Sequence, residues 1–235
     1  MYTLRLTLVA FVLASLALVQ GTTAVAASGY TLFGDATLVH PGNNSNTAVQ
    51  LRSVGTTYGG IDFATPTSMT VGGLSNLSTD YMFTTGSCGG GAPRFQLNTT
   101  LGNIFVYIGP APNYTNCASN IWVPSANVLY PFVDTSQIGG TFYDTWAHAQ
   151  AMWGSLAITG IQLVTDGGWA VGGTQIVLVD NVMINDTTYT FEPEPTKDSC
   201  KNGGWQDFTS SPGPFKNQGD CVSFFASGGK NEADK

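Results

Sequence analysis

The clearest pattern of apolar and polar positions lies between residues 157 and 184. Two runs rich in Ile, Val and Leu, Ala157–Thr165 and Thr174–Ile184, flank a glycine-rich connector, Asp166–Gly173. Short apolar runs separated by Asp-Gly and Gly-Gly are typical of a strand, a turn and a second strand. The second run is apolar at both odd and even positions, which predicts a central strand that is covered on both faces.

Further short segments of strand character follow one another along the chain. Thr47–Ser53 alternates between polar and apolar residues and predicts a half-exposed strand. Phe142–Trp153 has the spacing of a short helix, and Gly154 follows it as a stop. Roughly nine to eleven short strands with one short helix predict an all-β fold, a jelly-roll β-sandwich. The remaining expected strands are Gly29–His40, Tyr58–Phe63, Ser68–Val71, Leu74–Thr84, Arg94–Leu97, Asn103–Ile108 and Thr188–Phe191.

The amino-terminal residues have the pattern of a signal peptide. Arg5 precedes the apolar run Leu6–Val19, and Ala24-Val25-Ala26 gives a small-x-small cleavage pattern. The run is shorter than the roughly 20 residues that a membrane span needs, although an uncleaved anchor is the alternative. We therefore assign residues 1–26 to a signal peptide and expect no membrane span after its cleavage. The protein is expected to be secreted, either extracellular or associated with the cell envelope.

Charge divides the rest of the chain into two parts. The formal net charge is −7, and between residues 27 and 195 the only cations are Arg52 and Arg94, whereas all five Lys follow. An acidic body without Lys argues against nucleic-acid binding, which needs basic surface stripes. The change falls beside Glu192-Pro193-Glu194-Pro195, a sequence typical of a stiff linker. We expect a sandwich over residues 27–192, a linker over 193–199, and a small C-terminal module with its tail over 200–235.

Four cysteines behind a secretion signal predict disulfides. Three pairings are possible, and we favour Cys88–Cys117 and Cys200–Cys221 because each bridge stays within one part of the chain. A zinc site is the disfavoured alternative, since there is no C-x-x-C spacing and no neighbouring His. N-x-S/T sequons predict surface turns in a host that glycosylates, at Asn43, Asn76, Asn98, Asn113 and Asn185.

Aromatic residues near loop tips are candidates for ligand binding. Trp169 lies in the glycine-rich connector, where an indole is expected to be exposed. A flat ring stacks on the C–H face of a pyranose, while Asp accepts hydrogen bonds from hydroxyl groups. The alternative is that these rings fold into the core, as large aromatics usually do. The residues of this expected glycan site are Trp169, Asp166, Tyr58, Tyr114 and Trp122.

Catalytic motifs are scarce in this sequence. It contains no G-x-S-x-G and no H-E-x-x-H, and His40 and His148 have no cluster of ligand-type residues near them in sequence. Glycoside hydrolysis needs two placed carboxylates, for which Asp134 and Asp144 are the only pair worth testing. Their spacing does not show that they face one another, so we favour a non-catalytic module over a hydrolase that acts on glycans.

One segment supports a resemblance to a known fold family. Val177–Ile184, VLVDNVMI, resembles the closing strand of galactose-binding-like jelly rolls, the fold of many carbohydrate-binding modules. The resemblance covers about Gly29 to Glu192 and implies that Asp180 helps to hold a structural calcium ion. Calcium takes six to eight oxygens, so Asp35 would be a second ligand if the first and last strands pair. The alternative for Asp180 is a carboxylate that caps backbone amides at a β-bulge.

Three other segments resemble a group of secreted microbial proteins without assigned function. They are SCGGGAPRFQL, VDTSQIGGTFYDT and VTDGGWAVGGTQIVLVDNV, and the Cys-bounded tail resembles a short module appended to many such proteins. Together these patterns predict a secreted, non-catalytic module that binds a glycan or another cell-surface ligand. The alternative is a structural or adhesive surface protein without a small-ligand site.

Overall fold

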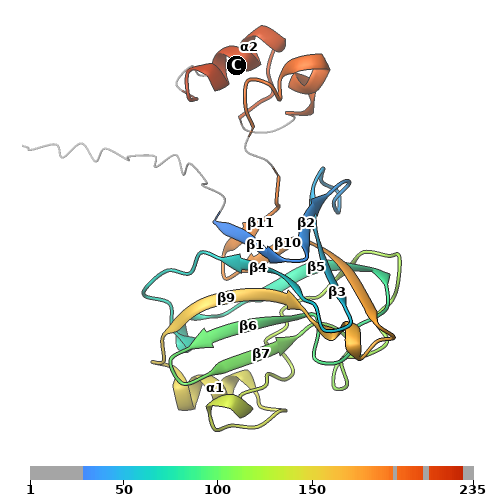
Figure 1. Cartoon of the computed structure of the whole chain (residues 1–235). Helices are drawn as coiled ribbons and strands as arrows, with labels where there is room; N and C mark the ends of the chain where they lie inside the picture. Colours follow the sequence, from blue (N-terminus) through green and yellow to red (C-terminus); the bar gives the residue numbers. More distant parts are fainter. Residues whose placement is uncertain (1–28, 193–194, 209–211, 230–235) are drawn as a thin grey trace, which may run out of the picture.

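A computed structural model describes residues 29–192, 195–208 and 212–229. The predicted signal peptide and part of the predicted linker lie outside the described residues. Two antiparallel sheets stack face to face, so the prediction of an all-β sandwich is confirmed (Figure 1). Within the described ranges, no helix is both long and apolar enough to cross a bilayer.

The two sheets contain eleven strands between them. One sheet has five strands in the order β1, β4, β9, β6, β7, and the other has the path β2, β3, β10, β5, β8, with β11 paired to β10. The first sheet comprises β1 (Tyr30–Gly34), β4 (Gly59–Phe63), β9 (Ile158–Thr165), β6 (Arg94–Thr99) and β7 (Asn103–Tyr107). The second comprises β2 (Ala36–Val39), β3 (Ala48–Val54), β10 (Thr174–Ile184), β5 (Leu77–Thr85), β8 (Val123–Pro124) and β11 (Thr187–Tyr189).

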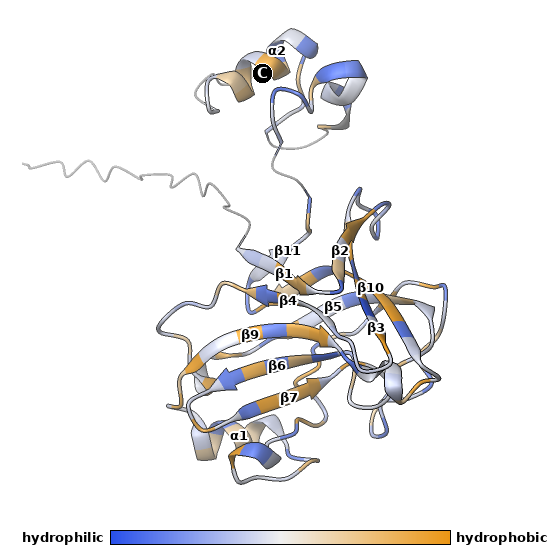
Figure 2. Ribbon diagram, in the orientation of Figure 1, coloured by the Kyte–Doolittle hydropathy of each residue, from blue (hydrophilic) through white to orange (hydrophobic). Residues whose placement is uncertain are grey.

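The five-stranded sheet is apolar on its inner face because its strands alternate. Ile61, Leu163, Phe95 and Val106 lie directly opposite one another on neighbouring strands and have no exposed surface. The alternation is visible along the ribbon as bands of opposite hydropathy (Figure 2). Because successive side chains of a strand point to opposite faces, every second residue of these strands is left on the outer face. That outer face carries the candidate site.

The two runs that flank the glycine-rich connector do not form a hairpin. β9 belongs to the five-stranded sheet and β10 to the other one, so the connector with its short 3-10 turn, η3 (Gly167–Trp169), passes between the sheets. Both predicted strands are therefore present, but they belong to different sheets. β10 instead lies between β3 and β5, which confirms its central position.

A β-bulge explains why β10 is apolar at both parities. Val177 and Val179 face the core, and the register with β5 shifts between Asp180 and Met183. Asn181 has a φ of 48° at this point, and beyond it the residues of even number, Val182 and Ile184, face the core. A bulge reverses the alternation of a strand. Only one face of β10 is therefore buried, and the residues on it change from odd to even numbers at the bulge. The opposite face is half-buried, and not fully covered as predicted.

The short helix begins later than the sequence pattern indicates. α1 spans Trp146–Trp153, and the side chain of Thr145 caps it by accepting a hydrogen bond from the backbone N–H of His148. Thr is a preferred N-cap residue, and Phe142 precedes the cap in a turn. A second difference concerns Ser68–Val71, which forms a turn and the start of the 3-10 helix η1 (Val71–Gly73) instead of a strand.

The C-terminal part is a small helical module. It contains the 3-10 segment η4 (Lys201–Asp207) and the helix α2 (Gln218–Ala226) around a cluster of Cys200, Phe215 and Cys221. Both predicted disulfides are confirmed, with Cα–Cα distances of 5.4 Å for Cys88–Cys117 and 5.8 Å for Cys200–Cys221. Two disulfides are consistent with an extracellular protein.

Candidate functional site

A line of side chains crosses the outer face of the five-stranded sheet. Five residues lie opposite one another from strand to strand, and we call them the outer row: Thr31, Asp62, Gln162, Gln96 and Phe105. Neighbouring strands are about 4.8 Å apart, so the four steps of the row span roughly 19 Å. The row thus presents hydroxyl, carboxylate and amide groups in sequence, with an aromatic ring at the β7 end.

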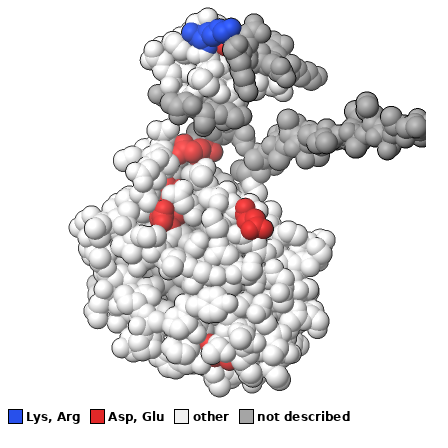
Figure 3. Space-filling model, turned by 180° about the vertical axis from the view of Figure 1, so that it is seen from behind, with Lys and Arg blue, Asp and Glu red and all other residues white. Residues whose placement is uncertain are grey.

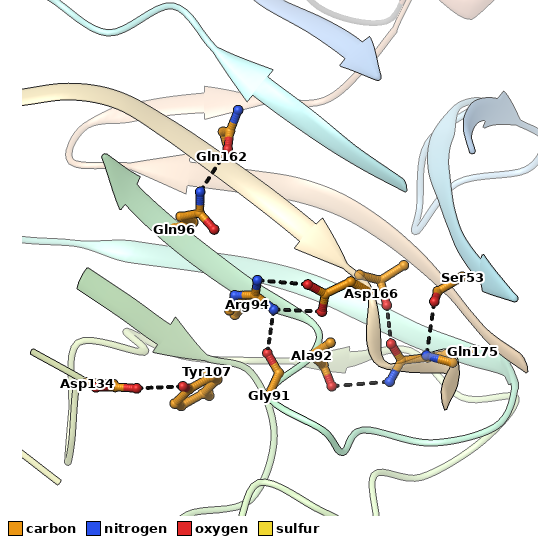
Figure 4. A network of polar contacts seen from close by, with 12 residues as sticks. Ser53, Gly91, Ala92, Arg94, Gln96, Tyr107, Asp134, Gln162, Asp166 and Gln175 are labelled. Atoms are coloured by element: carbon orange, nitrogen blue, oxygen red, sulfur yellow. Dashed lines mark hydrogen bonds and ion pairs between the residues drawn. The ribbon is translucent and has the colours of Figure 1, made fainter. Parts of the chain in front are cut away.

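The central side chains of the outer row are held in place by amide contacts. Gln96 Nε2 donates to Gln162 Oε1 at 3.3 Å and to Asn98 Oδ1 at 3.0 Å, and Figure 4 shows the first of these contacts. Asp62 is exposed, and its carboxylate makes no hydrogen bond or ion pair with any described residue. The row therefore has two ordered amides beside one carboxylate that is available to a ligand.

An ion pair closes one end of this face. Arg94 NH1 and NH2 donate to the two carboxylate oxygens of Asp166 at 2.7 and 2.9 Å (Figure 4). Arg94 also donates to the carbonyl of Gly91 at 2.9 Å and lies 4.8 Å from the ring centre of Phe105. Its side chain is only 13% exposed. Asp166, predicted to bind ligand, is thus engaged in a bidentate pair that orients Arg94.

Aromatic residues border the face at β7. Tyr107 donates to Asp134 Oδ2 at 2.7 Å, and burial, reinforced by this hydrogen bond, raises the pKa of the Tyr107 hydroxyl above its usual range. The ring of Phe142 stacks on Tyr107 with centres 5.4 Å apart, and Tyr114 lies 5.5 Å away. Tyr114 is buried, so it supports this border from below and corresponds to the core alternative considered for the aromatics.

The opposite border of the face lies at β1. The ring of Phe33 covers Gly60 so closely that a Cβ atom there would lie within 2.2 Å of it. Tyr58 is 54% exposed, and its ring centre is 6.2 Å from that of Phe33. Gly59 pairs with Thr165, so Tyr58 and Asp166 extend from the same end of two paired strands.

The other two predicted aromatic residues, like Tyr58 and Tyr114, lie outside the outer row. Trp169 is 66% exposed on the connector, as predicted. The backbone N–H of its neighbour Gly168 donates to Ser53 Oγ at 3.0 Å, which places the connector at the same end as Tyr58. Trp122 is half-buried just before β8, at an edge of the other sheet. The structure thus gathers Trp169, Tyr58 and Asp166 at one end of the sandwich and leaves Trp122 apart.

The central residues of the row were not predicted from the sequence. Asp62, Gln96 and Gln162 each lie between two buried apolar residues of their strands. A single polar residue between two apolar ones, repeated in three segments, was the available signal. It could be used only after those three segments were known to be neighbours in one sheet.

Asp180 satisfies its carboxylate without a metal ion. Its Oδ2 accepts hydrogen bonds from the backbone N–H of Asn43 at 2.8 Å and from Ser45 Oγ at 2.5 Å, and its Oδ1 accepts from the N–H of Asn181 at 2.7 Å. Burial raises the pKa of Asp180, and these hydrogen bonds oppose that rise. This is the amide-capping arrangement at a bulge that was the alternative to calcium.

The two residues predicted to bind calcium have other partners in the structure. Asp35 forms an ion pair with Arg52 at 2.5 Å, and Arg52 lies opposite Ile176, four residues along β10 from Asp180. Asp35 and Asp180 therefore have separate partners, and a calcium site that uses both stays a prediction. In the part of the chain that is described, no group of three or more His, Cys, Asp or Glu side chains is placed to hold a metal.

The two carboxylates considered for hydrolysis have structural partners. Asp134 accepts from Tyr107 and from the N–H of Ser136 at 2.9 Å, and Asp144 accepts from Thr135 Oγ1 at 2.6 Å and is 2.8 Å from His148 Nδ1. Both are buried. Burial tends to raise the pKa of Asp144, but hydrogen bonds from Thr135, His148 and the N–H of Thr145 outweigh it, so the pKa is lowered. These contacts fasten the segment that borders β7.

The sequons differ in how accessible their Asn residues are. Asn113 is exposed, whereas the other four are half-buried. The amide nitrogen of Asn43 donates to Asp80 at 2.8 Å, and that of Asn185 donates to the carbonyl of Gly73 at 2.9 Å. Asn113 is therefore the sequon best placed to carry a glycan, ahead of Asn43, Asn76, Asn98 and Asn185.

No protein-family model, curated protein or solved structure matches the chain. The β-sandwich is compatible with a jelly roll. Seen from behind, the sandwich shows isolated acidic groups, and the basic side chains visible among the described residues belong to the C-terminal module (Figure 3).

Proposed function

We propose that the protein is a secreted, non-catalytic module whose sandwich binds an extended glycan along the outer row. The observation that carries the proposal is the alignment of Asp62, Gln162 and Gln96 in direct register across three neighbouring strands. Amide and carboxylate groups exchange hydrogen bonds with pairs of sugar hydroxyls, and a regular row of them suits a repeating ligand.

Geometry and aromatic content favour a sugar chain over a compact ligand. The spacing of about 4.8 Å between strands is close to the length of one pyranose unit in an extended β-linked chain. Phe105 within the row, and Phe33 and Phe142 at the two borders, offer apolar ring surface to the C–H faces of sugars. Each strand can thus meet one sugar unit.

The proposal assigns no catalytic step to the module. Asp134 and Asp144 accept hydrogen bonds that stabilise the loop beside β7, and neither belongs to the outer row. The C-terminal module, with its own disulfide and aromatic cluster, is a separate appendage to which we assign no ligand.

Calorimetric titration with neutral β-linked oligosaccharides of increasing length tests the proposal. Affinity is expected to increase with each sugar until the chain spans the row, because each strand adds hydrogen-bonding groups. Gln162→Ala should weaken binding by about tenfold, since each lost hydrogen bond contributes about 0.5–1.5 kcal/mol. The matched control is Gln50→Ala, because Gln50 lies on the outer face of the other sheet, in register with Thr37 and Leu178.

Two results would contradict the proposal. Equal losses from Gln162→Ala and Gln50→Ala would show that the outer row is not the site. Absence of binding to any glycan by the folded protein would favour the structural or adhesive alternative.

A further inference from the structure

We infer that the outer row selects uncharged glycans and rejects polyanionic ones such as chains of uronic acids. This inference rests on the proposed function and adds the charge class of the ligand. It is drawn from the placement of every charged side chain on or beside the outer face of the five-stranded sheet.

No cation of the sandwich is available to an anionic sugar at the row. Within residues 29–192 the only Lys or Arg residues are Arg52 and Arg94. Arg94 is bound at both ends of its guanidinium group by Asp166 and is almost covered. Arg52 lies on the other sheet, in a strand that pairs with β2 and β10, and is itself paired with Asp35.

The charge that the face does present is negative. Asp62 stands exposed within the outer row, without a partner among the described residues, and Asp166 at the end of the face is 35% exposed. A neutral sugar can donate its hydroxyl hydrogens to these carboxylates. A uronic-acid chain would place a carboxylate on each unit, and at least one would lie near Asp62, where like charges repel.

The test compares two β-1,4-linked pentasaccharides by calorimetry with the whole protein. One is the neutral mannopentaose, and the other is penta-mannuronate. The acidic ligand is expected to bind at least about tenfold more weakly, because like-charge contacts at an interface are strongly unfavourable. The difference should shrink as salt is added, since the Debye length falls from about 30 Å at 0.01 M to about 3 Å at 1 M.

Two charge reversals provide a matched pair of variants. Asp62→Lys places a cation in the outer row and is expected to raise the affinity for penta-mannuronate at least about tenfold. Asp186→Lys makes the same change in net charge at an exposed turn after β10, and it should leave both affinities unchanged. Asp62 and Asp186 are both exposed, so both variants are expected to fold.

The outcomes separate this inference from the proposed function. Penta-mannuronate that binds the wild-type protein as tightly as the neutral ligand would overturn the charge selection while leaving glycan binding intact. Equal gains from Asp62→Lys and Asp186→Lys would also overturn it, because selection would then reside in the overall charge. If neither ligand binds, the proposed function itself fails.

Discussion

The outer faces of the two sheets differ, although their inner faces are alike. Both sheets bury a continuous apolar inner face, represented by Leu163 in one and Val177 in the other. On the outside, Gln162 lies opposite Gln96 in the five-stranded sheet, whereas Leu178 lies opposite Met82 in the other. The inner faces therefore account for the fold, and the outer faces show where the molecule has groups to offer a ligand.

Substitutions on either side of β9 should give the largest contrast in stability. Leu163→Ala removes a side chain without exposed surface and is expected to lower the free energy of unfolding by about 2–5 kcal/mol. Gln162→Ala, the adjacent residue on the outer face, is expected to cost less than about 1 kcal/mol. Denaturant titration of the two variants measures both values, and equal losses would show that the outer row is part of the fold's support.

The pH dependence of stability should separate two buried carboxylates with opposite shifts. The pKa of Asp144 is lowered, so its contribution is present above the usual Asp value of about 3.9 and is lost as pH falls through the folded-state pKa. The pKa of Asp180 is raised, so the folded state takes up that proton first, and stability from this group increases as pH falls through its folded-state pKa.

Thermal unfolding between acidic and neutral pH, with Asp144→Asn and Asp180→Asn, tests both signs. Asp144→Asn should reduce the loss of stability on acidification, and Asp180→Asn should make that loss steeper. A change in the same direction for both variants would contradict the opposite shifts.

A polar substitution on the outer face of the other sheet should have the smallest effect on stability and on binding. Leu178→Gln, on the half-buried outer face of β10, is expected to change the free energy of unfolding by less than about 1 kcal/mol and to leave glycan affinity unchanged. Denaturant and calorimetric titrations check the two statements. Loss of glycan affinity in this variant would move the proposed site to the other sheet.

Local signals in the sequence were sufficient for the fold class and the disulfides. Polar and apolar residues alternate within short segments such as Thr47–Ser53, and the charge composition changes at residue 195. Both signals depend only on residues that are close in sequence. The runs before and after the connector were correctly predicted as strands, but their placement in two different sheets could not be predicted, because connector length does not specify which sheet a strand joins. The helix start was misplaced because capping by Thr145 outweighed the periodicity of Phe142.

The candidate site was only partly accessible to sequence reasoning. Exposure of Tyr58 and Trp169 follows from their positions in loops. The outer row could not be predicted, because Asp62 and Gln162 are separated by 99 intervening residues and become neighbours only through the strand order. Asp166 was assigned to ligand binding because the sequence does not reveal its pairing with Arg94.

The bulge at Asn181 makes β10 tolerant of some genetic changes and intolerant of others. Exchange of Asn181 for Gly keeps the local backbone geometry, since both residues adopt a positive φ readily. Insertion of one further residue after Asn181 would instead reverse the alternation and turn Val182 and Ile184 to the half-buried outer face. An added residue at this position is therefore expected to cost more stability than the exchange of Asn181 for Gly.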